Sequence, residues 1–256
     1  MQESMRGNMK TLNQLFISQF EPLLATKGFK RKRNAFHRLH GEKIIQLLSI
    51  RKFQDSFTIQ YELIPICSGE GIEFPLDESR IGELVGNEAL LEWDIDDNLE
   101  QSLLEAHDKC EKLLYDWFDY VKDYRAYYDF VMYRHEKSLS LLSEERKLEI
   151  AKTMKFPWSV GLYEVFLCLG EYEKAVAVLQ QLLDQKISAM ETNKKYGYQP
   201  TEQSLNEQKE LICKIDKTRE FQKGICSPDK MLKENEEKTL DSYLKNFCMF
   251  RGRLLC

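Results

Sequence analysis

The sequence lacks the motifs from which an enzyme class is usually recognised. Its 256 residues contain no Gly-rich phosphate loop, no His-Glu-x-x-His, no Gly-x-Ser-x-Gly and no paired-carboxylate motif in an apolar setting. Catalytic groups converge in space and not in sequence, so an enzyme stays open although no catalytic residue can be named. We therefore expect no cofactor, and we favour binding over catalysis.

Disulfide and membrane signals are also missing. The seven cysteines are scattered and odd in number, without any Cys-x-x-Cys, so neither a disulfide framework nor a zinc ribbon is indicated. No apolar run approaches the roughly 20 residues that span a bilayer, and the start has no charged-then-apolar pattern. With 43% hydrophobic residues the chain can still bury a sizeable core. We expect a globular protein with reduced thiols in the cytoplasm.

The formal net charge of −5 conceals a strong segregation of charge along the chain. Residues 27–43 carry seven Lys or Arg against one Glu, whereas residues 70–100 carry eleven Asp or Glu against one Arg. Such asymmetry has two interpretations. Either the basic block binds an anionic partner, or the charges belong to one fold in which they face each other or are solvated. We favour the second interpretation.

Hydrophobic periodicity predicts an α+β first third. Residues 11–27 carry apolar side chains at helical spacing, and Gly28 follows as a C-terminal cap. Strand patterns follow at 29–39, 43–52 and 57–66. We predict that the helix packs on the apolar side of a three-stranded antiparallel meander whose other face is largely wet. Lys and Arg on the first strand would also protect a sheet edge.

From residue 99 onward the pattern is helical to the end of the chain. A heptad-like apolar seam over 99–124 predicts one long spine helix, packed within the chain or, as the rival, in a dimeric coiled coil. The aromatic cluster at 124–133 is typical of a helical core, with base stacking as the other interpretation. We predict two domains, an α+β domain at 1–93 and an all-helical domain at 94–256.

Helical hairpins are predicted for the second domain. Residues 162–183 are similar to the turn of a tetratricopeptide repeat, present in a single copy, which favours one αα-hairpin packed on the spine. Two further helices, one reaching about residue 222 and one beginning at Ser227-Pro228, would pair antiparallel across the corner at 224–227.

One weak metal pattern stands on the predicted spine. His107 and Cys110 are three residues apart and close to Glu111, a spacing that can direct two ligands to one ion. Further ligands cannot be named, and a half-buried cysteine on an apolar seam is the ordinary interpretation. We therefore predict no metal site.

The predicted meander resembles the bacterial family known as domain of unknown function 4304. The residues that carry the resemblance are Gly28-Phe29-Lys30, Phe36 with Arg38, Ile44-Ile45-Gln46-Leu47, and Phe53 followed by Phe57-Thr58-Ile59-Gln60. The match covers the first third of the chain, and longer members are similar in carrying helical C-terminal extensions. The second strand ends in Ile50-Arg51-Lys52, where the family pattern has a Gln-Lys-Ser-like sequence. The resemblance implies no activity, cofactor or catalytic residue.

Two functional hypotheses follow. The first is a non-enzymatic protein-interaction module, such as a bacterial accessory or toxin-neutralising protein, that recognises another protein through the acidic region 70–100. The second is a nucleic-acid-binding protein that contacts phosphates through the basic block, namely Lys30, Arg31, Lys32, Arg33 and Arg38. A hydrolase or nuclease is a third, weaker option without a catalytic set. A membrane partner is not expected.

Overall fold

The computed structural model describes residues 11–69, 79–86, 91–96, 98–157, 161–250 and 253–254. The chain divides into two compact units. Unit 1 comprises Met1–Leu63, Glu73–Asp123 and Lys245–Cys256, and unit 2 comprises Ile64–Ile72 and Tyr124–Leu244. Within the described residues no helix combines the length and the apolar character needed to cross a bilayer. The predicted α+β class is confirmed. In this division the helices up to residue 123 belong to the same unit as the sheet, whereas the domains predicted from the sequence are 1–93 and 94–256.

Unit 1 begins with the predicted amphipathic helix, α1 (Leu12–Thr26). Its first turn is closed by a capping box, in which the Gln14 amide N–H donates to Thr11 Oγ1 and the Thr11 N–H donates to Gln14 Oε1. Gly28 follows the helix with a φ of 80°, the left-handed conformation that favours glycine. The buried side of α1 consists of Leu15, Phe16, Phe20 and Leu24.

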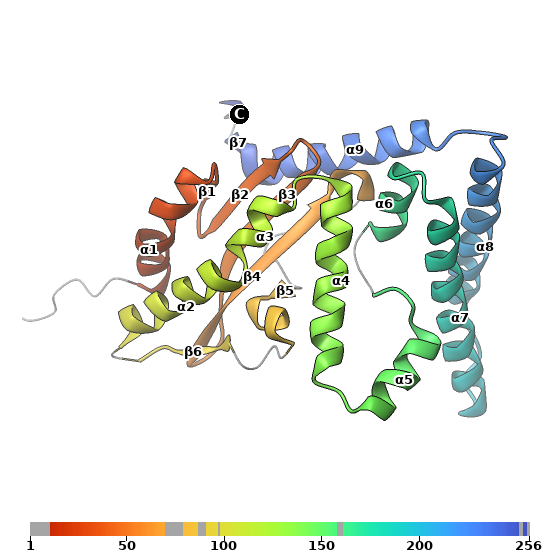
Figure 1. The fold of residues 1–256 in the computed structure, drawn as a ribbon, viewed down its shortest axis with the longest axis horizontal. Helices are drawn as coiled ribbons and strands as arrows, with labels where there is room; N and C mark the ends of the chain where they lie inside the picture. Colours follow the sequence, from red (N-terminus) through yellow and green to blue (C-terminus); the bar gives the residue numbers. More distant parts are fainter. Residues whose placement is uncertain are drawn as a thin grey trace, which may run out of the picture. The chain divides into compact units, whose positions relative to one another are not determined.

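The unit 1 core also contains a sheet whose strands differ in length (Figure 1). Its strands are β1 (Lys30–Lys32), β2 (Ala35–His40), β3 (Ile44–Lys52), β4 (Ser56–Pro65), β5 (Ser79–Arg80) and β6 (Trp93–Asp94). The order is β1-β2-β3-β4-β5, and β6 pairs with the first residues of β4 beside β5. The β1–β2, β2–β3, β4–β5 and β4–β6 pairs are antiparallel. The sheet therefore extends the predicted meander at both ends.

The first predicted strand, 29–39, is divided into two. A two-residue turn at Arg33 and Asn34 folds β1 back on β2, so that Lys32 pairs with Ala35 and Lys30 with His37. Arg33 adopts a φ of 56°, a region that non-glycine residues seldom occupy. A turn position with positive φ is usually recognised by Gly or Asn. Because Arg33 stands there, within a run of charged residues, the sequence did not indicate this turn.

Neither face of the sheet is wet, contrary to the prediction that one face is largely exposed to water. Gln46, Thr58 and Gln60 are each at most 2% exposed, although they occupy the polar positions of the strand patterns. Gln46 faces the helices, and the Thr58 hydroxyl donates to the Leu91 carbonyl at 2.9 Å. On the opposite face the His37 ring lies 5.0 Å from the ring of Phe247. Both faces are covered, and the buried polar groups are used for hydrogen bonds between segments.

The predicted spine over 99–124 is wrong, because three helices replace it: α2 (Leu99–Leu113), α3 (Tyr115–Tyr120) and α4 (Tyr124–Ser140). The breaks occur at Leu114 (φ −119°, ψ −39°) and at Val121 (φ −81°, ψ 81°). Gln46 Nε2 donates to the Phe118 carbonyl at 2.8 Å and to the Val121 carbonyl at 2.9 Å. The carbonyl groups freed at the end of α3 thus find their donors on the sheet, which stabilises the break.

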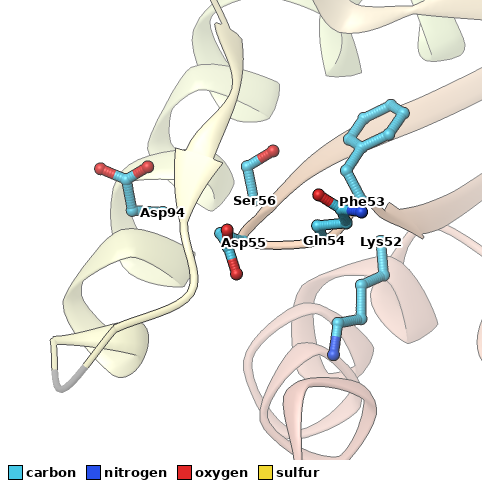
Figure 2. Close-up of a pocket in the computed structure, with 6 residues that line it drawn as sticks. All are labelled: Lys52, Phe53, Gln54, Asp55, Ser56 and Asp94. Atoms are coloured by element: carbon cyan, nitrogen blue, oxygen red, sulfur yellow. The ribbon is translucent and has the colours of Figure 1, made fainter.

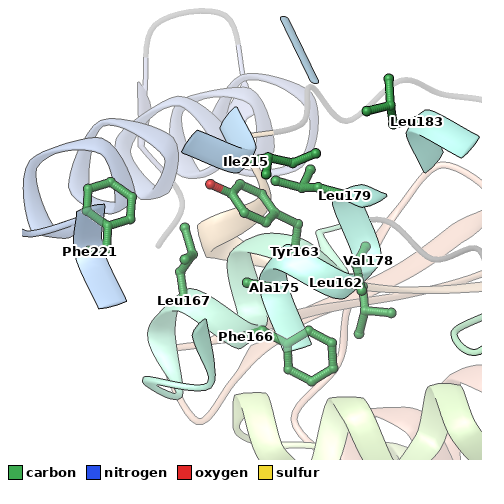
Figure 3. Close-up of a cluster of buried hydrophobic side chains, with 10 residues drawn as sticks. All are labelled: Leu162, Tyr163, Phe166, Leu167, Ala175, Val178, Leu179, Leu183, Ile215 and Phe221. Carbon is green, nitrogen blue, oxygen red and sulfur yellow. The ribbon is translucent and has the colours of Figure 1, made fainter. Parts of the chain in front are cut away.

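The described residues of unit 2 comprise the last two residues of β4, a short 3₁₀ turn, η1 (Ile66–Ser68), and a set of helices. Its helices are α4, α5 (Glu144–Thr153), α6 (Leu162–Cys168), α7 (Tyr172–Lys195), α8 (Glu202–Gln222) and α9 (Asp229–Tyr243). Gly170, with a φ of 69°, forms the tight corner of the predicted αα-hairpin between α6 and α7. Figure 3 shows the apolar cluster that α6, α7 and α8 share, in which Phe166 and Ala175 are fully buried.

The predicted antiparallel pairing of the last two helices is not the main packing. α8 packs chiefly against α7, and α9 packs chiefly against η1. The Asn235 side-chain amide donates to the Cys67 carbonyl at 3.0 Å, and the Tyr124 hydroxyl donates to Glu236 at 2.9 Å. These two hydrogen bonds connect α9 to η1 and to the first residue of α4. The chain is also not helical to its end, since β7 (Met249–Phe250) and β8 (Arg253–Leu254) form a small hairpin in unit 1.

Candidate functional site

The basic block lies at the edge of the unit 1 sheet. Lys30, Arg31 and Lys32 form β1, the outermost strand, and Arg33 occupies the turn that follows. Lys30, Arg31 and Arg33 are exposed, and Lys32 is half-buried. Successive side chains of a strand point to opposite faces, so these cations do not form one patch. The short, charged strand also suits a protected sheet edge.

Arg31 lies on the face of the sheet that α1 covers. It is paired with Phe36, whose ring lies 5.5 Å from that of Phe16 in α1. Arg31 Nε donates to Glu21 at 3.0 Å, and both side chains are more than 40% exposed. An exposed pair of this kind contributes little to stability and can exchange with a ligand.

Arg38 differs from the other four candidates because it is buried inside unit 1. Its Nε donates to Gln46 at 2.7 Å, its Nη2 donates to the Phe118 carbonyl at 2.7 Å and to Asp119 at 3.2 Å, and its Nη1 donates to the Lys27 carbonyl. Burial lowers the pKa of Arg38, and the Asp119 carboxylate opposes that change. The guanidinium therefore joins β2, β3 and α3, and its donors are directed into the protein.

His37 lies on the other face of the sheet, where it is paired with Lys30 of the neighbouring strand β1. Burial, together with the neighbouring Lys30 and Lys32, lowers the pKa of His37 to about 4. The imidazole is therefore neutral near pH 7, and the positive charge on this face comes from the lysines. His40 follows the same trend, since burial and the charge of Arg38 lower its pKa.

The acidic region 70–100 can be placed only in part. Residues 70–78, 87–90 and 97 lie outside the described residues. Among the described ones, Glu92 accepts from Arg80 at 3.2 Å, and the Arg80 guanidinium lies 4.9 Å from the ring of Phe53. The hypothesis that this region recognises another protein stays a prediction.

A shallow hollow lies near the β3–β4 turn (Figure 2). Lys52, Asp55 and Asp94 supply its charges, and Phe53 its aromatic ring. The turn is closed by the Phe53 N–H, which donates to the Ser56 carbonyl at 2.8 Å. The hollow is open to solvent, so it offers no enclosed environment in which these groups would acquire unusual chemistry.

The described residues of unit 2 form a better enclosed cavity of about 240 Å³ between α6, α7, α8 and residues 154–157. Its apolar lining includes Leu162, Val178, Leu179, Leu182 and Leu211. Polar side chains that also line it include Glu164, Gln181, Gln185 and Lys214. Because Gln185 and Lys214 are exposed while Leu162 and Leu179 are buried, the cavity is apolar inside and polar at its rim.

One side chain of α7 fixes a wall of this cavity. Gln181 Oε1 accepts from the backbone N–H groups of Lys155 (2.7 Å) and Phe156 (3.0 Å). Gln181 Nε2 in turn donates to the Phe156 carbonyl at 2.7 Å. These three bonds hold the segment before α6 against α7. No sequence motif indicates the cavity, because Gln181 and its partners are separated by 25 or more residues.

The metal pattern on α2 takes a different form from the sequence expectation. The ligand atoms that approach one another are those of His107, Asp108 and Glu111, all within 4.8 Å. Cys110 faces the core instead, and burial raises the pKa of its thiol. The His107 ring packs 4.9 Å from Phe20. Two exposed carboxylates beside a core histidine are an ordinary helix surface, so we assign no metal to them.

The aromatic cluster at the start of α4 lies mainly in a core. Tyr124, Tyr127 and Phe130 are buried, and the half-buried ring of Tyr128 lies 5.2 Å from Phe166.

Comparison with known proteins gives no further guide: no family model, no curated protein and no solved structure matches this chain. The resemblance in the first third therefore stays a prediction.

Proposed function

We propose that this protein is a non-enzymatic protein-interaction module that takes an apolar side chain of a partner protein into the cavity between α6, α7 and α8. The observation that carries the proposal is the cavity itself, with its apolar interior and polar rim. This combination suits a peptide segment, because an apolar anchor fills the interior while the peptide backbone meets the polar groups.

The size of the cavity favours a side chain over a cofactor. Pockets for drug-sized ligands and cofactors usually hold about 300 to 1,000 Å³. The cavity here, about 240 Å³, is smaller. The described residues that line it include no cysteine and no histidine, so they offer no soft metal ligand and no group that titrates near neutral pH.

The cavity is preformed rather than assembled by the ligand. Besides the Gln181 bonds, the Tyr163 hydroxyl and the Thr218 hydroxyl lie 3.0 Å apart and connect α6 with α8. The Lys214 ammonium lies 5.8 Å from the Tyr163 ring centre, at the rim. Groups that are already ordered lose less entropy on binding, so a short peptide can bind with useful affinity.

The test is selection of peptides on the intact protein. A phage-displayed library of random peptides is enriched on the wild type and depleted on Leu211→Trp, whose larger ring occupies the cavity. We expect the selected peptides to share one large apolar residue. In calorimetry, Leu211→Trp should weaken such a peptide by about 30-fold, the loss of a hot-spot contact of about 2 kcal/mol.

The matched control is Ile212→Trp, the next residue of α8, which is 43% exposed and does not line the cavity. Its affinity should stay within about twofold of the wild type, because contacts outside the anchor pocket carry little energy. Gln185→Trp, at the exposed rim, covers the cavity without enlarging a core residue. Equal binding by all three variants, or no enrichment on the wild type, would refute the proposal.

The basic edge supports a second candidate function, phosphate contact with nucleic acid through Lys30, Arg31, Lys32 and Arg33. Lys30, Arg31 and Arg33 are exposed within four consecutive positions, and they lie on both faces of the edge strand and in its turn. The test is fluorescence anisotropy with single-stranded RNA, in which log K should fall by about 0.7 per phosphate contact per log unit of salt. Charge reversal at Lys30 and Arg33 together should lower both affinity and salt slope, and unchanged binding would eliminate this function.

The proposal also includes a cytoplasmic location and a bacterial accessory or toxin-neutralising role. A cytoplasmic setting is supported by the free thiols of Cys67, Cys110, Cys168, Cys213 and Cys226. A bacterial origin is supported by the resemblance in the first third, and an accessory or toxin-neutralising role by the acidic region 70–100 and the lack of catalytic motifs. Rescue of growth on co-expression with a toxin encoded beside its gene would support that role, and the absence of rescue would count against it.

A further inference from the structure

Two cysteines that are far apart in sequence meet in unit 2. Cys67 belongs to the turn η1, and Cys168 is the last residue of α6. η1 and α6 pack against each other, and the Cys67 and Cys168 side chains interact there. Cys67 is 0% exposed, whereas Cys168 is half-buried and is thus the more accessible of the two.

The backbone around the pair is held in place from two sides. Asn235 of α9 donates its side-chain amide to the Cys67 carbonyl at 3.0 Å. At the other end of α6, a Cβ atom on Gly161 would lie only 2.6 Å from the Ser68 Cβ, so α6 and η1 approach as closely as a glycine allows. This packing holds η1 and α6, the two elements that carry the cysteines, against each other.

The surroundings make the two thiols unequal. Burial and the adjacent Cys168 raise the pKa of Cys67, so its thiolate is scarce at neutral pH. The Tyr124 hydroxyl contacts the Cys67 sulfur and donates to Glu236 at 2.9 Å. An incoming oxidant therefore meets Cys168 first, and Cys67 stands behind it as the resolving thiol.

We propose that Cys67 and Cys168 form a redox modification site, a dithiol that closes reversibly to a disulfide when a small disulfide such as glutathione disulfide is present. The Cys168 thiolate attacks one sulfur of glutathione disulfide, forms a mixed disulfide and releases one glutathione thiolate. The Cys67 sulfur then attacks the Cys168 sulfur, its proton passes to the departing glutathione thiolate, and the second glutathione leaves. Two protein thiols are oxidised and one glutathione disulfide is reduced to two glutathione molecules.

The bond would close a loop of about 100 residues, and loops of that length gain most from a cross-link in the chain-entropy description. It would connect η1 covalently to the α6–α7 hairpin, within one compact unit. Oxidised protein should therefore unfold at a higher temperature than reduced protein, by about 5 °C or more. The difference should disappear after treatment with dithiothreitol.

The test uses the full chain, reduced and then incubated with glutathione disulfide under native conditions. Remaining thiols are alkylated, and the protein is digested and analysed by mass spectrometry. We expect a cross-linked pair of peptides containing Cys67 and Cys168, lighter by two hydrogens than the separate peptides, and faster migration of the whole chain on a non-reducing gel. Cys168→Ser and Cys67→Ser should each abolish both signals.

Cys110→Ser serves as the matched control, because Cys110 is also buried but is not one of the pair. It should leave the cross-link unchanged. The proposal is overturned if glutathione adducts form only on the exposed Cys213 and Cys226, or if the Cys67–Cys168 link appears only after denaturation in urea.

Discussion

The two units are stabilised in different ways. In unit 1 a buried guanidinium and a buried amide, Arg38 and Gln46, connect the sheet to the carbonyl groups at the end of α3. In unit 2 the shared core of α6, α7 and α8 is an apolar cluster around Phe166. A buried polar network requires every partner in place, whereas an apolar core tolerates change as long as its volume is filled. Unit 1 should therefore be sensitive to charge and pH, and unit 2 to volume.

The largest effect is expected from removing volume in unit 2. Phe166 is 0% exposed, and its ring lies within 5.5 Å of those of Tyr128 and Phe156. Phe166→Ala should lower the free energy of unfolding of unit 2 by about 3 to 5 kcal/mol, the transfer and cavity cost of a buried aromatic ring. Amide hydrogen exchange resolves the two units, and faster exchange confined to unit 1 would contradict the comparison.

A slightly smaller loss is expected from the polar network of unit 1. Arg38→Met preserves much of the side-chain length but leaves the Lys27 carbonyl and the Gln46 Oε1 without their guanidinium donor. The cost should be about 3 kcal/mol, the sum of unsatisfied buried acceptors. Arg33→Met is the matched control, exposed on the same hairpin, and should change unfolding by less than about 0.5 kcal/mol. Equal unfolding curves for the two variants would show that the network contributes little.

Acid should weaken unit 1 through His37. Its pKa is about 4 in the folded protein and about 6.5 in the unfolded chain, so the unfolded chain binds more protons between these values. The stabilisation is therefore complete above pH 6.5 and is lost as the pH falls toward 4, by about 2 to 3 kcal/mol. Urea unfolding at several pH values measures this slope. His37→Gln should remove most of it, and an unchanged slope would contradict the assignment.

The smallest effect concerns an exposed charge pair of unit 2. Lys186 of α7 and Glu207 of α8 form an ion pair, which lowers the pKa of the Glu207 carboxyl. Because the Glu207 carboxylate is exposed and Lys186 is only half-buried, Lys186→Met should cost little stability, and the cost should vanish at high salt. A larger loss in thermal unfolding would mean that charge matters in unit 2 as it does in unit 1.

Local patterns predicted the elements whose signals are local. Helix α1 with its stop at Gly28, strands β3 and β4, and the corner at Gly170 all follow from spacing and glycine. The break of the predicted spine could not be predicted in this way, because the Arg38 donor that reaches Phe118 is 80 residues away. The apolar seam is buried in its first part, at Leu103, Ala106 and Cys110. Beyond the break at Leu114 the burial moves to Phe118 and Val121, and Tyr120 of the seam is 50% exposed.

The sites show the same limit more strongly. The sequence found every cation of the basic block, yet charge alone could not separate the exposed Arg33 from Arg38, whose partners come from three other segments. The cavity in unit 2 and the Cys67–Cys168 contact arise where separate segments meet, so no spacing indicates either. Common residue types form a site only when the fold brings them together from separate segments.

The most direct test of the proposed function is a methyl NMR titration of the full chain with a selected apolar peptide. The account predicts that signals of Val178, Leu182 and Leu211 shift as the peptide saturates, while those of Leu39 and Leu48 in unit 1 stay in place. Shifts confined to unit 1, or no shift of the cavity methyl groups at saturation, would contradict it.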